Sequence, residues 1–272
     1  MTTPAATDVV FSGSIPELYD TLMVPLLFAP YADDLARRVA ALGPGRVLET
    51  AAGSGAVTRA LARALPEGCE LVATDLNPPM LARAQAVGTA RAVTWQPADA
   101  QALPFPDASF DVLACQFGAM FFPDRPRAYA EARRVLKPGG HFIFNVWDRI
   151  EANEFAAAVA DALAALHPAA PPRFMQRTPH GYFERAAVEA DLAAAGFGAP
   201  GWDTLDARSH AASARVPATA LCQGTPLRGE IEALPGMTLA AATDACAAAL
   251  AARFGDGPVS ARIRAHVVTV TR

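Results

Sequence analysis

The residues with the clearest chemical potential are a glycine-containing loop and an aspartate about 20 positions later. Residues 47–55 read VLETAAGSG, a short apolar run followed by small residues, and Asp75 lies 22 positions after Gly53 (75 minus 53). Gly53 and Gly55 let the backbone turn tightly and approach a ligand, and the amides that open the following helix can bind an anion. An acidic residue at this interval reaches ribose hydroxyls. The pair predicts a site for an adenosine-containing cofactor, although Asp75 could instead cap the helix after Leu76.

The elements that would position these residues alternate between strands and helices. Such alternation predicts βαβ units and a mainly parallel sheet with helices on both faces. In these sheets ligands bind beyond the carboxyl ends of the strands, where the strand order reverses. The loop AAGSGAVT occupies that position. The predicted strands are 47–49, 70–75, 93–97, 110–116, 141–147, about 202–207 and 262–272, and the predicted helices are 57–65, 80–87, 125–136 and 184–195.

The remaining segments predict a cover over the ligand edge. The chain should form a single domain, 1–272, with a helical N-terminal lid over residues 1–45 and a cofactor-binding core over residues 46–148. The regular alternation fails in residues 149–184, and alanine-rich helices surround the loop QGTPLRG in residues 208–258. Segments of this kind in an α/β domain are typical of functional insertions. We expect these two inserts to form a substrate cap.

Composition excludes several classes of function. The 272 residues are 52% hydrophobic and 18% charged, which suits one globular α/β domain. A net charge of -4 disfavours binding to nucleic acid. No stretch is apolar enough to span a membrane and no signal peptide is evident, so the sequence predicts a cytoplasmic protein without a membrane partner. The four cysteines lack metal-ligand spacing, so we expect reduced, buried thiols and no metal site: Cys69, Cys115, Cys222 and Cys246.

Four motifs in order resemble a known family. The stretches VLETAAGSG, ATDLNPPML, WQPADAQALPFPDASFDVLACQFGAMFFPD and RRVLKPGGHFIFNVWD resemble a class I S-adenosylmethionine-dependent methyltransferase of the ubiquinone/menaquinone-biosynthesis type. The resemblance covers residues 45–148 strongly. It implies a Rossmann-like, doubly wound α/β fold with a seven-stranded sheet that is mostly parallel and whose last strand is antiparallel. It also implies S-adenosylmethionine as methyl donor and S-adenosylhomocysteine as product.

The chain departs mildly from the family's glycine loop, where an aspartate and a glycine usually stand in place of Glu49 and Ala51. These replacements bear on affinity more than on the identity of the cofactor. The sequence LKPGG, residues 136–140, is also a family signature. Physically it predicts a helix stop and a tight turn into the fifth strand.

The resemblance implies cofactor roles for eleven residues. Glu49 would organise the loop, and Ala51, Gly53 and Gly55 would line the methionine moiety. The ribose and adenine would be bound by the residues that follow strands two and three. Asp75 would bind both ribose hydroxyls, and Leu76 and Met80 would contact adenine. Asp99 would accept a hydrogen bond from the adenine amino group or instead cap a turn, and Ala100 would offer its amide. Gln116 would lie beside the methionine portion, and Tyr19, in the lid, would reach the methionine carboxylate.

The sequence does not identify a catalytic residue. The methyl group of a sulfonium is already electrophilic, so alignment alone can contribute about 7 to 11 kcal/mol. An acceptor that is protonated at neutral pH would also need a general base. His141 and His266 are predicted to be structural because they fall at the opposite edge and mid-strand. For each of the candidates nearer the pocket, a solvated or packing role is favoured over catalysis: Asp148, His180, Tyr182 and His210.

Aromatic residues after the fourth and fifth strands would suit an apolar or aromatic small-molecule acceptor, although each could simply be part of the core: Phe117, Met120, Phe121, Phe122 and Trp147. Two other functions stay open. A nicotinamide-dependent oxidoreductase would share Asp75, but Ala51 replaces the first glycine of GxGxxG and no glycine follows Gly55 at the helix-packing position. A non-catalytic cofactor-binding module is the second alternative. No motif identifies the acceptor atom or the pathway. For the oligomeric state, the sequence is compatible with a homodimer.

Overall fold

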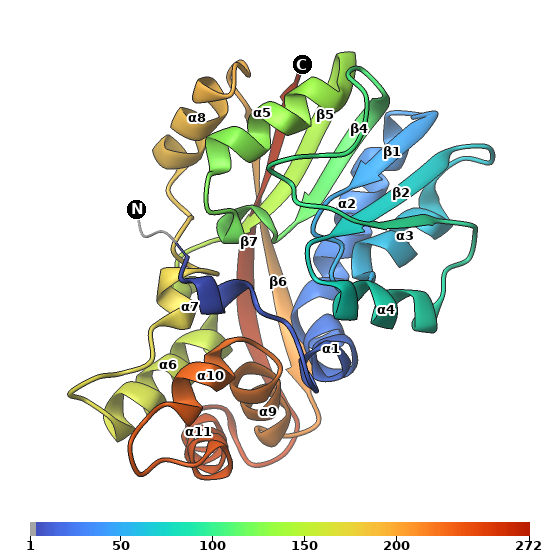
Figure 1. Cartoon of the computed structure of the whole chain (residues 1–272). Helices are drawn as coiled ribbons and strands as arrows, with labels where there is room; N and C mark the ends of the chain where they lie inside the picture. Colours follow the sequence, from blue (N-terminus) through green and yellow to red (C-terminus); the bar gives the residue numbers. More distant parts are fainter. Residues whose placement is uncertain (1–3) are drawn as a thin grey trace.

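The computed structural model describes residues 4–272, and its centre is a seven-stranded sheet in the order β3-β2-β1-β4-β5-β7-β6 (Figure 1). Strands β1 to β5 are parallel to one another, and β7 runs antiparallel to both β5 and β6. The predicted topology, with an antiparallel last strand, is therefore confirmed. The strand order reverses beside β1. The strands are β1 Arg46–Glu49, β2 Glu70–Asp75, β3 Thr94–Pro97, β4 Phe110–Gln116, β5 Leu136–Trp147, β6 Gly201–Ala211 and β7 Val259–Thr271.

Helices cover both faces of the sheet because apolar side chains alternate along the strands. Val47, Val112 and Ile143 belong to the cluster that contains the buried residues of α2 and α3. Leu48, Leu113 and Phe142, one position away on each strand, belong to the cluster under α5 and α8 (Figure 1). The helices of these two layers are α2 Ala29–Ala41, α3 Ala56–Ala64, α5 Arg125–Val135 and α8 Arg185–Ala194, and α4 Pro78–Val87 follows β2.

The N-terminal segment crosses the carboxyl edge of the sheet. It contains the 3-10 helix η1 Ala6–Val9, the short helix α1 Ile15–Leu18 and a π-helix, η2 Tyr19–Phe28. Pro25 lies inside η2 and Pro30 lies in the first turn of α2. A proline lacks the amide hydrogen that an α-helical ladder needs, which explains why the chain here departs from regular α-helix. The interruption at both prolines was predicted; the π-helical form was not.

A second group of helices lies beyond the carboxyl ends of the strands (Figure 1). Residues 259–264 of β7 extend past the end of β5 and pair with β6 alone. This two-stranded extension carries the group. Strand β6 continues four residues beyond its predicted end, so residues 208–211 are strand rather than the beginning of an insert. The group consists of η4 Ile150–Ala152, α6 Glu154–Leu166, α7 Phe174–Arg177, α9 Arg215–Gln223, α10 Leu227–Glu232 and α11 Leu239–Phe254.

The LKPGG segment differs from its prediction. The helix stops as expected, at Val135, but residues 136–140 belong to β5 instead of forming a separate tight turn. Phe110 pairs with Leu136 and Val112 pairs with His141, so the segment forms a wide bulge opposite Asp111. Gly139 has a φ of 79°, and a Cβ on Gly140 would lie 2.9 Å from the carbonyl oxygen of Asp111. The glycines thus allow a bulge that sequence alone did not distinguish from a turn.

Within residues 4–272, no helix combines the length and the apolar composition that crossing a membrane requires. The same part of the chain contains no cluster of three or more His, Cys, Asp or Glu side chains arranged to hold a metal ion. The four cysteines are buried free thiols.

Candidate functional site

A cavity of about 270 Å³ opens at the carboxyl ends of β1, β2 and β4, where the strand order reverses. The loops after β1, β2, β3 and β4 form its floor and sides, and the N-terminal segment forms its cover. Nine of the eleven predicted cofactor residues line it; Glu49 and Gly55 do not. The nine are Tyr19, Ala51, Gly53, Asp75, Leu76, Met80, Asp99, Ala100 and Gln116.

The two glycines of the loop have different structural roles. Gly53 has a φ of 57°, and a Cβ there would lie 3.5 Å from the terminal methyl of Met80 and 3.9 Å from Tyr19, inside the cavity. Gly55 has a φ of 86°, and its Cβ would lie 3.0 Å from the Cβ of Ala84, in the contact with α4. The structure therefore places Gly55 in helix packing rather than on the cavity wall where it was expected.

Ala51 is held in the left-handed region, with a φ of 53°. A residue with a side chain is strained there by about 1 kcal/mol or more, whereas glycine is not. We expect Ala51→Gly to raise the free energy of unfolding by about 1 kcal/mol, and the melting temperature by about 2–4 °C. Thermal and urea denaturation measure both. The control is Ala248→Gly, an exposed position within α11, which should lose about 1 kcal/mol; a loss of stability in both variants would contradict the prediction.

Asp75 links two of the loops at the cavity. Its Oδ2 accepts a hydrogen bond from the amide of Gly53, and its Oδ1 accepts one from the amide of Asn77, both at 2.8 Å. Asn77, not Asp75, is the N-cap residue of α4. Burial raises the pKa of Asp75. The Asn77 side-chain amide also donates to Oδ1, at 3.4 Å. Each carboxylate oxygen can accept two hydrogen bonds, so Oδ2 still has an acceptor site for a ligand.

Asp99 caps a turn, which was one of its two predicted roles, and it also lines the cavity. Its Oδ1 accepts a hydrogen bond from the amide of Gln101 at 2.8 Å, so the side chain does cap its own turn. It also lines the cavity, next to Ala100. The turn and the cavity position are compatible because a carboxylate has several acceptor sites.

Glu49 is buried behind the loop. The Thr58 hydroxyl donates to Glu49 Oε2 at 2.6 Å, which ties β1 to α3, and the Thr74 hydroxyl donates to the Glu49 carbonyl oxygen at 3.0 Å. Burial raises the pKa of Glu49 from 4.5 to about 8, and the nearby carboxylate of Asp75 acts in the same direction. Glu49 therefore contacts the loop's supports rather than the cavity.

This burial predicts a pH dependence. The folded protein keeps the Glu49 proton up to a pKa of about 8, whereas the unfolded chain loses it near 4.5, so the free energy of unfolding falls as pH rises between these values, by about 1.4 kcal/mol per pH unit. Glu49→Gln cannot titrate, and its stability should fall less steeply over the same range. Urea denaturation at pH 5, 6, 7 and 8 measures this. Equal slopes in the two proteins would contradict it.

Gln116 supplies an unpaired acceptor. Its Nε2 donates to the Phe28 carbonyl at 3.3 Å, while its Oε1 is buried and has no hydrogen-bond partner among residues 4–272. An unpaired buried acceptor is unfavourable by about 1–3 kcal/mol. The residue lines the cavity, so a ligand donor such as an ammonium group would satisfy it.

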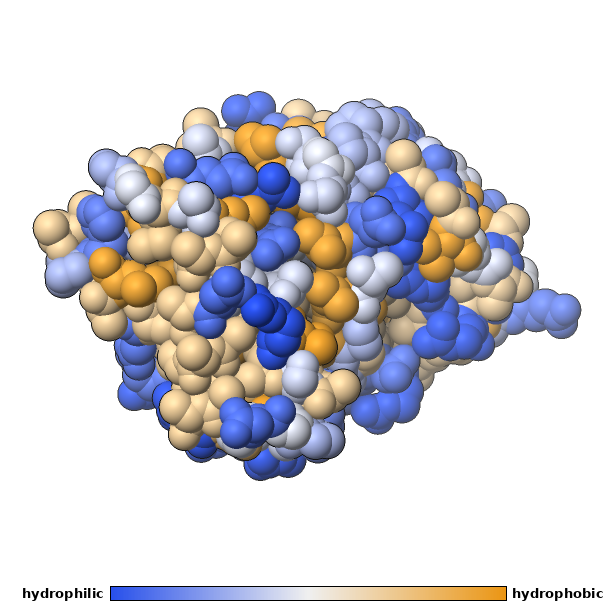
Figure 2. Space-filling view, turned by 90° about the horizontal axis from the view of Figure 1, so that it is seen from below, coloured by the Kyte–Doolittle hydropathy of each residue, from blue (hydrophilic) through white to orange (hydrophobic). Residues whose placement is uncertain are grey.

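A second, smaller cavity of about 50 Å³ adjoins the first and shares four of its lining residues, all aromatic: Phe11, Tyr19, Phe117 and Phe121. The Trp147 ring stacks on Phe117 with centroids 3.8 Å apart. No Asp, Glu, Lys or Arg of the described chain lines this cavity. Seen from the side of the second helix group, hydrophobic side chains are exposed in the middle of the face, with hydrophilic side chains around them (Figure 2). The second cavity suits an apolar or aromatic group.

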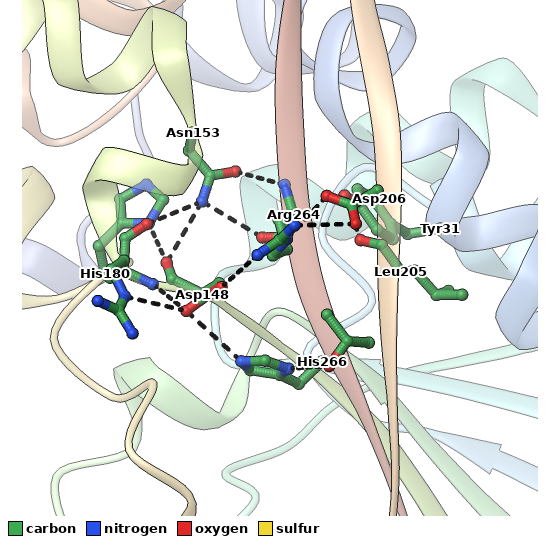
Figure 3. A network of polar contacts seen from close by, with 10 residues as sticks. Tyr31, Asp148, Asn153, His180, Leu205, Asp206, Arg264 and His266 are labelled. Atoms are coloured by element: carbon green, nitrogen blue, oxygen red, sulfur yellow. Dashed lines mark hydrogen bonds and ion pairs between the residues drawn. The ribbon is translucent and has the colours of Figure 1, made fainter.

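The histidines differ in their position relative to the two cavities. His266 Nδ1 lies 2.9 Å from the Thr204 hydroxyl, and its Nε2 lies 3.5 Å from Asp148 Oδ1 (Figure 3). His141 contacts Thr271 near the other edge of the sheet, and His210 is exposed on β6. These three lie outside both cavities, whereas His180 lines the second one.

The two remaining candidates also lie outside the cavities. The Tyr182 hydroxyl donates to Asp191 at 2.7 Å and receives a hydrogen bond from Tyr129. The Asp148 carboxylate accepts from the Arg149 amide at 2.7 Å and faces His266. Trp147, Phe117 and Phe121 do line the second cavity, whereas Phe122 lines only the first and Met120 is buried in the core.

Several lining residues were missed by sequence reasoning. Asn77 and Gln101 stand two residues after Asp75 and Asp99, so their positions at strand ends could have revealed them. Gly118 is close to Ala51: a Cβ at Gly118 would lie 2.4 Å from the Ala51 Cβ. No sequence pattern indicated a role for Phe11, because only the folded N-terminal segment brings it to the site. Its amide contacts the Asn77 side chain at 3.4 Å.

The fold and the cavity at its switch point define a doubly wound, Rossmann-like α/β domain. Residues 48–144 match the family model described as "Methyltransferase domain". These findings identify this part of the chain as a class I S-adenosylmethionine-dependent methyltransferase domain, related to the ubiquinone/menaquinone-biosynthesis methyltransferases.

Curated proteins are similar to part of the chain. The chain is 42% identical over 122 residues to an uncharacterised protein of Mycobacterium tuberculosis, which covers 44% of this chain and 43% of the relative. It is 43% identical over 102 residues to the demethylmenaquinone methyltransferase of Thermus thermophilus, covering 37% and 46%. The chain thus spans less than half the length of these curated relatives.

A solved structure shows the same fold. The phosphoethanolamine N-methyltransferase 2 of Haemonchus contortus, in complex with phosphomonomethylethanolamine and S-adenosylhomocysteine, superposes with a TM-score of 0.57 at 15% identity. The superposition covers 94% of this chain and 56% of that protein.

Proposed function

We propose that the protein transfers a methyl group from S-adenosylmethionine to a small-molecule acceptor. The observation that carries the proposal is the pair of adjoining cavities: one at the switch point with Asp75, Asp99 and Gln116 on its wall, the other apolar. The rival nicotinamide-dependent activity is disfavoured by the methyltransferase match over residues 48–144.

In this proposal the first cavity binds the cofactor. Asp75 accepts hydrogen bonds from the ribose hydroxyls, Leu76 and Met80 contact adenine, and Asp99 with the amide of Ala100 recognises its edge. At the other end, Gln116 Oε1 accepts from the ammonium group, and the Tyr19 hydroxyl donates to the carboxylate. The unpaired Gln116 oxygen and the free acceptor site on Asp75 Oδ2 support this orientation.

The bound sulfonium supplies an electrophilic methyl group, so the protein's own contribution is alignment and exclusion of water. Phe117 and Tyr19 line both cavities and therefore lie between donor and acceptor. The stacked Trp147 fixes the Phe117 ring. A rigid aromatic passage of this kind would hold an acceptor in line with the methyl group.

We also propose that residues 1–45 act as a lid and that the inserts at 149–184 and 208–258 form a substrate cap. Asp8 anchors the lid: it is buried, pairs with Arg177 at 2.5 Å and accepts from the Thr178 hydroxyl at 2.5 Å. Arg177 also pairs with Glu230 of α10 at 2.6 Å. These contacts hold η1 against α7, beside the residues that cover both cavities.

The same proposal covers the cellular location, the partners and the oligomeric state. Four unpaired, buried thiols suit the reducing cytoplasm, and the net charge of -4 disfavours a nucleic-acid partner. A homodimer is tested by analytical ultracentrifugation, where a single species of monomer mass would exclude it at the concentrations used.

The activity is tested with S-adenosylmethionine labelled in its methyl group. We expect label transfer to at least one acceptor in a panel of phenols, amines, thiols and lipid-like molecules. Cofactor binding without transfer to any of them would contradict the proposed enzyme and favour the non-catalytic module.

A further inference from the structure

We propose that His180 binds the acceptor through a hydroxyl or similar donor group and takes up its proton during transfer. The acceptor is then a neutral, largely apolar ring-bearing molecule with one such donor. This inference rests on the proposed methyltransferase function and deepens it. It stands on the second cavity and on the hydrogen bonds that orient the imidazole ring within it.

The tautomer of His180 is fixed by its partner. Its Nδ1 lies 2.9 Å from the carbonyl oxygen of Asp148 (Figure 3). A carbonyl oxygen only accepts hydrogen bonds, so Nδ1 carries the proton and Nε2 carries a lone pair. No residue in the range 4–272 forms a hydrogen bond to Nε2, and the ring lines the second cavity. His180 therefore offers a vacant acceptor to whatever enters that cavity.

The carbonyl that orients the ring is itself held firmly. The Asp148 amide donates to the Arg264 carbonyl at 3.1 Å, and Asn153 Nδ2 donates to the Asp148 carbonyl at 3.3 Å. Backbone packing also restrains the histidine: its amide donates to the Met175 carbonyl at 2.9 Å, and a Cβ on Gly181 would lie only 2.1 Å from the Arg177 carbonyl oxygen. The direction of Nε2 is thus set by the fold.

Two other polar side chains that line only the second cavity, Asn153 and Thr225, are already satisfied. Asn153 donates to three carbonyls, and its Oδ1 accepts from the Arg264 amide at 3.0 Å. The Thr225 hydroxyl donates to the Leu221 carbonyl and accepts from the Leu227 amide. On the shared wall, the Tyr19 hydroxyl also has no hydrogen-bond partner among the described residues. The Trp147 indole, which also lines the cavity, can only donate a hydrogen bond. A ligand hydroxyl in this cavity can therefore donate to His180 or to Tyr19.

The surroundings favour a neutral ring. Burial lowers the pKa of His180 to about 4, although the nearby carboxylates of Asp148 and Glu151 act in the opposite direction. His266 faces the carboxylate of Asp148 rather than this ring. A neutral imidazole among Phe, Trp, Met and Leu side chains gives no counter-charge to a charged acceptor. A phenol or an enol meets both requirements: an apolar body and one hydrogen-bond donor.

The transfer step conserves atoms and electrons. A bond forms between the acceptor oxygen and the methyl carbon as the bond from that carbon to sulfur breaks, and its electron pair stays on sulfur to give S-adenosylhomocysteine. The hydroxyl proton passes to His180 Nε2. Because burial disfavours the imidazolium, the proton leaves to water and the ring returns to its neutral form.

The test compares phenol with toluene, which has a methyl group in place of the hydroxyl. Calorimetry on the protein saturated with S-adenosylhomocysteine should show phenol binding about 5–10-fold more tightly, the value of one hydrogen bond. In His180→Asn, the amide nitrogen retains the donor to the Asp148 carbonyl but no atom replaces Nε2, so the preference should disappear. Unchanged preference in His180→Asn would overturn the proposal.

Two further variants complete the test. His180→Gln places an amide oxygen near Nε2 and should keep the phenol preference, yet it cannot take up a proton; labelled anisole formation should fall by about 100-fold. Tyr19→Phe should retain the preference, and its loss there alone would assign recognition to Tyr19. Wild-type protein that binds phenol beside S-adenosylmethionine but forms no anisole would overturn the transfer step. If S-adenosylhomocysteine does not bind at all, the proposed function fails, and phenol selectivity of the unliganded protein still tests His180.

Discussion

The Asp75→Asn variant is expected to bind S-adenosylmethionine at least about 100-fold more weakly than the wild type. Hydrogen bonds to a charged group are worth about 1.5–3 kcal/mol each, and two ribose hydroxyls would donate to Asp75. Loss of about 3 kcal/mol corresponds to about 100-fold in affinity. Asparagine also directs its NH₂ group at the amide of Gly53 or of Asn77, each of which donates to the carboxylate in the wild type. Isothermal titration calorimetry measures the dissociation constant.

Asp111→Asn is the matched control. Asp111 also accepts hydrogen bonds from two backbone amides, those of Gly45 and Arg46, but at the opposite edge of the sheet. Its substitution should lower the free energy of unfolding without changing affinity for the cofactor. Equal affinities of Asp75→Asn and Asp111→Asn would contradict the assignment of Asp75 to the ribose.

The second large effect is expected for Gly53→Val, which should abolish cofactor binding at concentrations that saturate the wild type. The new side chain would enter the cavity beside Met80 and Tyr19, on a backbone with a φ of 57°. Strain of this kind costs about 1–3 kcal/mol in stability, so the variant should melt at a lower temperature while staying folded. Calorimetry and thermal denaturation give the two quantities separately.

Gly68→Val is the control that introduces backbone strain without obstructing the cavity. Gly68 has a φ of 83°, and no heavy atom lies within 4 Å of a Cβ built there. This variant should lose similar stability but bind the cofactor like the wild type. If Gly53→Val also binds normally, the first cavity is not the cofactor site.

The core of the fold was predictable because the signals there are local. Alternating apolar runs and turn residues in residues 46–147 gave five parallel strands and the position of the ligand edge. The lengths of β6 and β7 were not predictable, because residues 208–211 and 259–261 become strand only by pairing with each other. The bulge at LKPGG likewise depends on its partner, Asp111.

The site was predictable to the extent that residues follow strand ends. Asp75, Asp99 and Gln116 reach the cavity for that reason. Gly55 could not be distinguished from Gly53, because its contact with Ala84 of α4 is tertiary. Phe11 comes from a segment without a regular pattern, so only the folded chain reveals its place in both cavities, whereas His180 was already a candidate near the pocket.

The central claim is that the cavity at the switch point binds S-adenosylmethionine. Calorimetric titration of the wild type with S-adenosylmethionine, S-adenosylhomocysteine and NADH tests it most directly. We expect one-to-one binding of S-adenosylmethionine and S-adenosylhomocysteine and no binding of NADH. Absence of binding of both adenosyl compounds at millimolar concentration, or binding of NADH in their place, would contradict it.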